Sequence, residues 1–270
     1  MKIIKCSWFL FFFLTLILLL GWTIYLSFQY YAPPSYRQPF QMRQETEDTL
    51  RIAYIGDSWA YWHKGHKCQI AQLLEDTLHR PVKVHSYGIC GRTSKEIYEN
   101  MFENSNFKDF LTRRKYEYCY VSAGINDTHK KMSILYYQQS LHNMIQLLLT
   151  NNVHPIIQEI PDYDIRMIDG KQKFYKKIAR RIYMLFHGIP VDCKQVFRDA
   201  LDDMIHENEF QDRVSIIRYK AWNNDYSNDL NHLYSQDHLH LNENGYVKLD
   251  SVIINEILTT IEHNNIHQKK

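Results

Sequence analysis

The sequence predicts an α/β domain built on a parallel β-sheet and preceded by one N-terminal transmembrane helix. From Arg51 onward, short apolar runs alternate with longer segments of helical periodicity, the pattern of parallel strands joined by crossover helices. A long uncharged run precedes this part of the chain. With 270 residues, 45% of them hydrophobic and 23% charged, the chain is long enough to bury one sizeable core.

The uncharged run covers residues 6–28, CSWFLFFFLTLILLLGWTIYLSF, and is long enough to cross a bilayer. A cleaved signal peptide has a shorter apolar core of about 7–15 residues, followed by small residues at the cleavage site. Here the run ends in SFQYYAPPS, so we predict an uncleaved signal anchor. Lys2 and Lys5 place residues 1–5 in the cytoplasm and the domain outside it. A buried core helix is disfavoured, because the run is apolar on every face.

Residues 29–50 are predicted to be a semi-rigid spacer, and residues 51–270 the folded domain. The stretch from Ala32 to Leu50 holds three of the seven prolines and no apolar periodicity. Without Lys2 and Lys5, the 32 basic residues become 30 and balance the 30 acidic ones. A neutral domain offers no electrostatic case for nucleic acid as a partner.

The predicted strands and helices alternate along the domain. Strands are expected at 51–56, 82–88, 116–124, 153–161 and 214–219, and helices at 66–79, 94–113, 133–150, 171–187, 195–208 and 243–262. In such sheets ligands bind at the carboxyl ends of the strands. The first three strands end in GDS (56–58), SYGICGRTS (86–94) and SAGINDT (122–128).

Each of these three motifs also has an ordinary structural interpretation. Serine or aspartate in GDS can cap a helix, and the glycines of the second motif can form a tight turn before a helix capped by Thr93 or Ser94. The third motif can be an Asx-type turn leading to the helix near 133. A fourth motif, SQDHLHLNENGY (235–246), favours catalysis, because Asp237 and His240 stand three residues apart. Serine hydrolases need such a base, and an acid that orients it.

Taken in order, the four motifs resemble the signature blocks of the SGNH or GDSL hydrolases. The matching residues are GDS at 56–58, GICGRTS at 88–94, GIND at 124–127 and DHLH at 237–240, and the resemblance spans about Arg51 to Gln268. It implies a flavodoxin-like three-layer α/β/α sandwich. It also implies a serine ester hydrolase that uses no cofactor.

The resemblance assigns roles to individual residues. It implies that Ser58 is the nucleophile, His240 the base and Asp237 the residue that orients it. It further implies an oxyanion hole formed by the backbone N–H groups of Ser58 and Gly91 and the side-chain amide of Asn126. Gly91 is preferred to Gly88 because the family's glycine precedes an x-Thr pair, here Arg92-Thr93. The sequence departs from the pattern at Trp59, where many members have leucine, and at Ser86, where asparagine is frequent.

A metal site is the main chemical alternative. Asp237, His238 and His240 lie close together in the sequence, and HKGHKC (63–68) is a second cluster of potential ligands. The second cluster lacks the spacing of a structural zinc site partnered by another pair of ligands. We therefore expect no metal.

The five cysteines bear on the same region of the fold. Cys6 lies in the predicted anchor, and the other four would stand in an oxidising compartment, where three pairings are open. Cys68 and Cys90 both lie near the predicted site and are the preferred disulfide. Cys119, in the middle of a strand, is expected to be a buried thiol.

The prediction is a membrane-anchored serine esterase that removes ester groups, most simply O-acetyl groups, from carbohydrate. The sequence fringes the site with aromatic residues (Trp59, Tyr61, Trp62 and Tyr87) and has no second strongly apolar run for an acyl chain. A lipase, a thioesterase, a glycan O-acyltransferase and a non-catalytic binding or scaffold protein are the alternatives.

The expected location is the bacterial periplasm or cell surface. The one N-x-S/T sequon, at Asn126, would destroy the oxyanion hole if it were glycosylated. Within the region 162–211, KFYKKIARRIYMLF is predicted to form an amphipathic helix with a solvated basic face. The sequence makes no prediction of oligomeric state.

Overall fold

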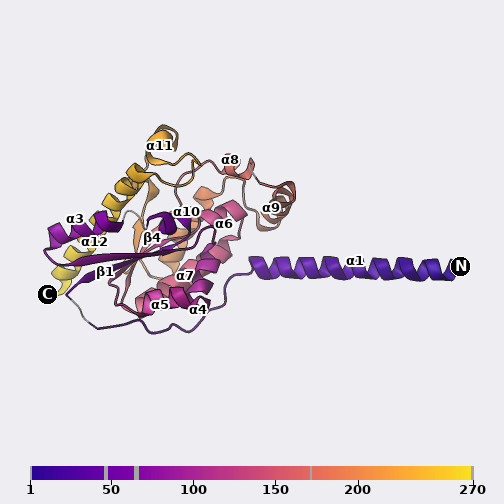
Figure 1. The fold of residues 1–270 in the computed structure, drawn as a ribbon, viewed down its shortest axis with the longest axis horizontal. Helices are drawn as coiled ribbons and strands as arrows, with labels where there is room; N and C mark the ends of the chain where they lie inside the picture. Colours follow the sequence, from indigo (N-terminus) through magenta and orange to yellow (C-terminus); the bar gives the residue numbers. More distant parts are fainter. Residues whose placement is uncertain (1, 46–47, 64–66, 171, 269–270) are drawn as a thin grey trace. The chain divides into compact units, whose positions relative to one another are not determined.

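A computed structural model of the chain describes residues 2–45, 48–63, 67–170 and 172–268. The chain divides into two compact units, Met1–Pro33 and Pro34–Lys270. The first unit consists of helix α1 (Lys2–Tyr31), and the second is the α/β domain (Figure 1).

Helix α1 includes the whole predicted anchor. By length and composition its segment Trp8–Tyr31, 24 residues long, is apolar enough to cross a membrane. Two hydroxyl groups within it, those of Thr15 and Thr23, donate hydrogen bonds to carbonyl oxygens one turn earlier. These polar groups are thereby satisfied inside the helix, as a lipid environment requires.

The domain is built on a five-stranded parallel sheet, as predicted. Its strands are β1 (Leu50–Gly56), β2 (Val82–Gly88), β3 (Tyr118–Ser122), β4 (His154–Gln158) and β5 (Ser215–Ile217), in the order β2-β1-β3-β4-β5. All four neighbouring pairs are parallel. The last three strands are shorter than the predicted ranges.

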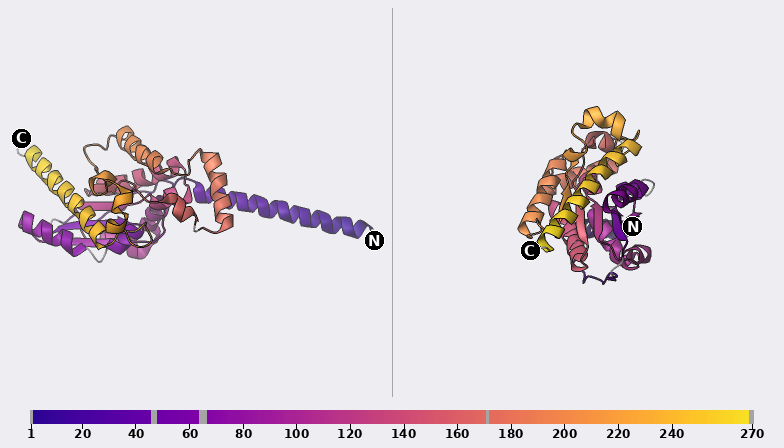
Figure 2. Two further views of the ribbon diagram at one scale, coloured as in Figure 1. Left: turned by 90° about the horizontal axis from the view of Figure 1, so that it is seen from above. Right: turned by 90° about the vertical axis from the view of Figure 1, so that its left-hand side faces the viewer.

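Helices cover both faces of the sheet and complete three layers (Figures 1 and 2). One face carries α3 (Lys67–Leu78) and α12 (Glu243–Gln268); the other carries α4 (Ser94–Glu103), α5 (Ser105–Thr112), α7 (Ile134–Thr150) and α10 (Lys194–Glu207). Parallel crossovers are right-handed. The crossover from β1 to β2 moves toward one edge of the sheet, and the later crossovers move toward the other edge. The helix of the first crossover, α3, therefore falls on the opposite face from α4, α5, α7 and α10. The predicted α/β/α sandwich is confirmed.

Several short helices were not predicted from the sequence. They are α6 (Ile125–Lys130), α8 (Ile165–Gly170), α11 (Tyr226–Leu233) and the 3-10 turn η1 (Tyr219–Ala221). Most are too short to show a helical period, and α6 replaces the Asx-type turn expected before residue 133. The helix predicted over 94–113 is two helices, because Asn104 is extended and its side chain caps α5.

Part of the predicted spacer belongs to the domain. The backbone N–H of Arg37 donates to the Tyr98 hydroxyl at 2.9 Å, and the backbone N–H of Met42 donates to the Asn151 side chain at 2.6 Å. Met42 is buried in the core. Two backbone N–H groups of this proline-rich segment thus find partners on the domain.

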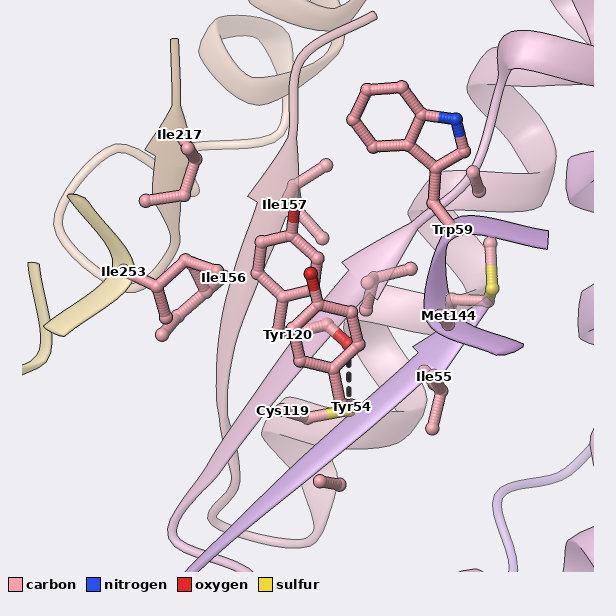
Figure 3. Close-up of a cluster of buried hydrophobic side chains, with 14 of the residues drawn as sticks. Tyr54, Ile55, Trp59, Cys119, Tyr120, Met144, Ile156, Ile157, Ile217 and Ile253 are labelled. Carbon is pink, nitrogen blue, oxygen red and sulfur yellow. Dashed lines mark hydrogen bonds between the residues drawn. The ribbon is translucent and has the colours of Figure 1, made fainter. Parts of the chain in front are cut away.

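The core corrects the expected position of one aromatic residue. Trp59, in α2 (Ser58–His63), was predicted to fringe the site, but it is fully buried among core side chains (Figure 3). It lies edge-on to Trp222, with ring centroids 5.8 Å apart. Trp62, three residues later on the same short helix, remains 52% exposed.

Candidate active site

The register of the sheet brings three of the sequence motifs to one edge. Gly56 at the end of β1 stands opposite Gly88 of β2 and opposite Ser122 of β3. The segments that follow these three residues therefore leave the sheet side by side. They carry Ser58, Gly91 and Asn126, in this order.

Gly56 is required by the close packing of this edge. Its φ is +147°, and a Cβ atom at this position would lie 2.0 Å from the carbonyl oxygen of Ser122. A side chain would therefore both strain the backbone and push the neighbouring strand away. The absence of a side chain lets the chain turn at Asp57 and begin α2 at Ser58, so the Ser58 N–H belongs to the first turn of a helix, where backbone donors lack helical partners.

A serine, a histidine and an aspartate lie in hydrogen-bond contact at this edge. The Nε2 atom of His240 is 2.8 Å from the Oγ atom of Ser58. On the other side of the ring, Nδ1 of His240 is 2.5 Å from Oδ2 of Asp237. Ser58 and His240 are 182 positions apart in the sequence, so only the tertiary fold brings them together.

The loop that carries His240 is held by its own backbone. An antiparallel bridge joins Tyr234 and Leu241, and the backbone N–H of Ser235 donates to the carbonyl of His240 at 2.7 Å. The loop then enters α12, where the Tyr246 hydroxyl donates to the carbonyl of Trp59 at 3.1 Å. This bond links the helix after His240 to the helix that begins with Ser58.

Asp237 is kept ionised by its hydrogen bonds. Partial burial acts to raise the pKa of its carboxyl group, but the His240 ring and the backbone N–H groups of His240 and Leu239 outweigh this effect and lower the pKa. The ionised carboxylate can only accept, so the Nδ1–H group of His240 donates to it, and Nε2 is left as the acceptor that faces Ser58.

Asn126 is oriented by a buried carboxyl group that the sequence analysis did not assign. Its side-chain nitrogen donates to Oδ2 of Asp57 at 3.2 Å, so the nitrogen and not the oxygen of the amide faces Asp57. The other oxygen of Asp57 accepts from the Trp59 N–H at 3.0 Å and the Ser122 hydroxyl at 3.3 Å. Complete burial raises the pKa of Asp57 to about 6, although these bonds and the nearby His240 act to lower it.

Gly91 lies in the loop before α4, with a φ of +74°. Space beside its Cα is open. Lys130, on α6, donates to the carbonyl oxygen of Gly91 at 2.9 Å and to the Glu96 side chain at 3.1 Å. The loop is therefore tied to the same short helix that carries Asn126.

Asp127 holds the start of α4. Its two oxygens accept hydrogen bonds from the Ser94 N–H at 2.8 Å and the Ser94 hydroxyl at 2.6 Å. Thr93 forms a capping box with Glu96, as the sequence suggested for Thr93 or Ser94. The partnership of Asp127 and Ser94 has no signal in the sequence, because the two residues belong to different motifs.

The predicted disulfide lies outside the described side chains. The side chain of Cys68 is not described, and Cys90 is exposed beside Gly91. Cys119 is a buried thiol, as expected, and burial raises its pKa far above the usual range. Cys193 is also buried.

A cleft of about 600 Å³ opens beside His240. Its lining combines aromatic and aliphatic side chains with polar ones, and its exposed surface is more apolar than polar; the lining residues are Trp62, Ser235, Asp237, His240, Leu241, Asn242, Glu243 and Tyr246. Trp62 is the exposed aromatic side chain of this wall. Within the described part of the chain, no three His, Cys, Asp or Glu side chains are grouped so that they could hold a metal ion.

The buried carboxyl group of Asp127 leads to a pH-dependent prediction. Burial raises its pKa to about 7, against the bonds from Ser94 that act to lower it. In the unfolded chain an aspartate titrates near about 3.9, so the proton binds more tightly in the folded state. The contribution of protonated Asp127 to the free energy of unfolding is therefore fully present below about pH 4 and is lost as the pH rises to about 7.

Asp127→Asn removes this titration. We expect the free energy of unfolding of the wild type minus that of the variant to fall between about pH 4 and about pH 7 and to be constant above. Urea unfolding of the full chain in detergent micelles, at a series of pH values, measures this difference. A difference that does not change with pH over this range would contradict the raised pKa.

Comparisons with known proteins agree with this architecture. No protein-family model matches the chain, and no curated protein sequence matches it. Solved structures do match. The lipase/acylhydrolase from Enterococcus faecalis is 16% identical, with a TM-score of 0.54 over 77% of this chain and 95% of that one.

Two further structures have similar scores. A member of the lipolytic protein G-D-S-L family from Veillonella parvula is 16% identical, with a TM-score of 0.52 over 76% of this chain and 97% of that one. An acetyl xylan esterase is 13% identical, with a TM-score of 0.53 over 77% of this chain and all of that one (100%). The domain of this protein therefore has the fold of the GDSL, or SGNH, hydrolases.

Proposed function

We propose that the protein is a serine ester hydrolase of the SGNH type, with Ser58, His240 and Asp237 as its catalytic residues. The observation that carries the proposal is the hydrogen-bonded series from Ser58 Oγ to His240 Nε2 and from His240 Nδ1 to Asp237. A nucleophile beside a base that a third group orients is the arrangement on which acyl transfer depends.

In the proposed mechanism His240 takes the Ser58 proton as the hydroxyl oxygen attacks the ester carbonyl carbon. The resulting imidazolium is stabilised by Asp237 and gives its proton to the departing alcohol oxygen, so the carbon–oxygen bond breaks and an acyl-serine remains. Water, deprotonated by the same ring, then attacks the acyl group. The proton that the ring took from the water passes to the departing Ser58 oxygen, and a carboxylic acid is released.

The proposed oxyanion hole uses three donors, the N–H groups of Ser58 and Gly91 and the side-chain amide of Asn126. The bond to Asp57 supports the role of Asn126, because it fixes which end of the amide is the nitrogen. That nitrogen carries a second N–H for the developing oxyanion. A donor held before the reaction needs no reorganisation in the transition state.

Substitution of the proposed catalytic residues gives the most direct test. Ser58→Ala and His240→Ala should each lower kcat for an ester by about 10⁴-fold or more, and the double variant should lose no more than either one, because the residues act as a unit. Ser58→Ala should also abolish labelling by a fluorophosphonate probe. Asp237→Asn should cause a smaller loss, because the backbone bonds of the loop still position the ring.

His238→Asn is the matched control. This residue lies in the same loop with a φ of +60°, a conformation that asparagine tolerates. We expect activity and labelling near those of the wild type. Equal and severe losses from the changes at His238 and His240, reversed by added zinc, would replace the serine mechanism with metal catalysis.

We further propose that the substrates are acetyl esters on carbohydrate. The mixture of polar side chains with the exposed indole of Trp62 in the cleft supports this class, because sugar rings combine hydroxyl groups with an apolar face that packs on aromatic rings. One similar structure is an acetyl xylan esterase, so the fold can serve such a substrate.

A panel of esters tests the substrate. We expect kcat/KM for acetyl esters to exceed that for octanoyl esters by about tenfold or more, because Asp237, Asn242 and Glu243 line the cleft beside His240 and would lose hydration against a long acyl chain. Trp62→Ala should raise KM for an acetylated oligosaccharide by about fivefold and leave a small aryl acetate unaffected. A preference for long acyl chains would identify a lipase or thioesterase instead, and acyl transfer to an added sugar would identify a transferase.

We also propose that α1 anchors the chain in a membrane, with residues 1–5 in the cytoplasm and the domain outside. Lys2 and Lys5 precede the apolar segment and support this orientation. A tag at Met1 should therefore resist protease added to intact spheroplasts, while the same protease digests the domain. Protection of the domain and digestion of the tag would reverse the proposed orientation, and release of the domain without α1 would indicate a cleaved signal.

A further inference from the structure

Helix α9 (Phe174–His187) exposes an apolar face to solvent. Leu185 is 85% exposed, Phe186 81% and Phe174 77%. Ile178 and Ile182 are also exposed, and positions 174, 178, 182 and 185 recur at the spacing of one helical face. Figures 1 and 2 show α9 beside α8 at the periphery of the domain.

The polar side of α9 faces the domain. Arg180 lies 3.0 Å from Nε2 of His129 on α6, and Lys177 donates to the carbonyl of Gly170 at 3.0 Å. Burial, followed by the charge of Arg180, lowers the pKa of His129 to about 3, so a neutral ring accepts this bond. An amphipathic helix of a globular protein normally turns its apolar face to the core, and α9 does the reverse.

Positive charges border the exposed face. Lys176 and Arg181 are exposed and stand on opposite sides of the apolar face, and the 14 residues of α9 contain no Asp or Glu. An apolar face with aromatic and aliphatic side chains, bordered by basic residues, is the composition of helices that lie in a membrane interface.

We propose that α9 lies in the surface of a bilayer that contains anionic lipids, with its apolar face among the acyl chains. Lys176 and Arg181 reach back to the headgroups, as long basic side chains do at this depth. Two copies of α9 facing each other would bring like charges together, which argues against a second copy as the occupant. The proposal rests on the membrane anchoring proposed for α1 and is independent of the esterase activity.

The tether and the topology make this contact feasible. Helix α1 ends at Tyr31, and the backbone of Arg37 already hydrogen-bonds Tyr98 of the domain, so an inserted α1 keeps the domain at high local concentration near the bilayer. Helices α8 and α9 follow β4 at its carboxyl end, the same edge of the sheet that carries Ser58. Contact through α9 would thus present this edge to the membrane.

Hydrogen exchange of the full chain in lipid nanodiscs, at one chain per disc, tests the proposal. Discs of phosphatidylcholine alone are compared with discs that also contain phosphatidylglycerol. Two basic residues at an anionic surface shift a binding equilibrium by about tenfold or more, and we expect the amides of α9 to exchange more slowly by a similar factor in the anionic discs. Amides on the buried side of α7, such as those of Leu141 and Met144, should not change.

Two pairs of substitutions identify the contacts. Leu185→Glu with Phe186→Glu should abolish the slower exchange, and Lys176→Glu with Arg181→Glu should abolish its dependence on phosphatidylglycerol. Leu135→Glu on α7, another exposed leucine (60%), is the control and should leave the exchange of α9 as in the wild type. Hydrolysis of a soluble acetyl ester should be unchanged in all these variants, which separates this test from that of the esterase.

Three results would overturn the proposal. The first is equal exchange of α9 in both kinds of disc. The second is slower exchange that depends on the number of chains per disc and not on lipid charge, which would identify a second copy as the occupant. The third is slower exchange in anionic discs that survives Leu185→Glu with Phe186→Glu.

Discussion

Two buried carboxyl groups, Asp57 and Asp127, hold together the loops on which the candidate site depends. Both are inaccessible to solvent, and burial raises the pKa of each. Removing a carboxyl group from water is costly unless hydrogen bonds replace its hydration. Here the donors come from different segments of the chain, including Asn126 for Asp57 and Ser94 for Asp127. The cost of burying these groups is thus offset only when the segments are correctly assembled.

Helix α6 is the element through which these contacts run. Its residues Asn126, Asp127 and Lys130 bind, respectively, Asp57 beside the serine, Ser94 at the start of α4 and the carbonyl of Gly91. A helix of six residues has little stability of its own, so its conformation is imposed by these partners and by the packing beneath it. The relative position of three proposed oxyanion donors therefore depends on one short segment.

The two unusual apolar surfaces of the chain have the same physical character. Helix α1 is apolar on every side, and α9 presents its apolar side to solvent while its polar side is bound to the domain. Neither surface is buried in the core: the apolar segment of α1 is 0% buried, and α9 has no buried residue. With the proposed esterase activity, a chain held at a bilayer by both would act on substrates at or near a membrane surface, and the polar side chains in the cleft beside His240 would receive the hydrophilic part of the substrate.

Sequence alone determined the parallel α/β fold, the apolar helix and the residue types of the site, because apolar periodicity and short motifs are local properties. The motifs named Ser58, His240, Asp237 and Asn126, which the fold brings to one edge of the sheet. Only the tertiary structure decided the burial of Trp59, the existence of α6, the partners of Asp57 and Asp127, and the outward direction of the apolar face of α9. Each of these depends on contacts between distant segments. A local pattern specifies that a helix has an apolar face, but what that face meets is set by the neighbours that the rest of the chain supplies.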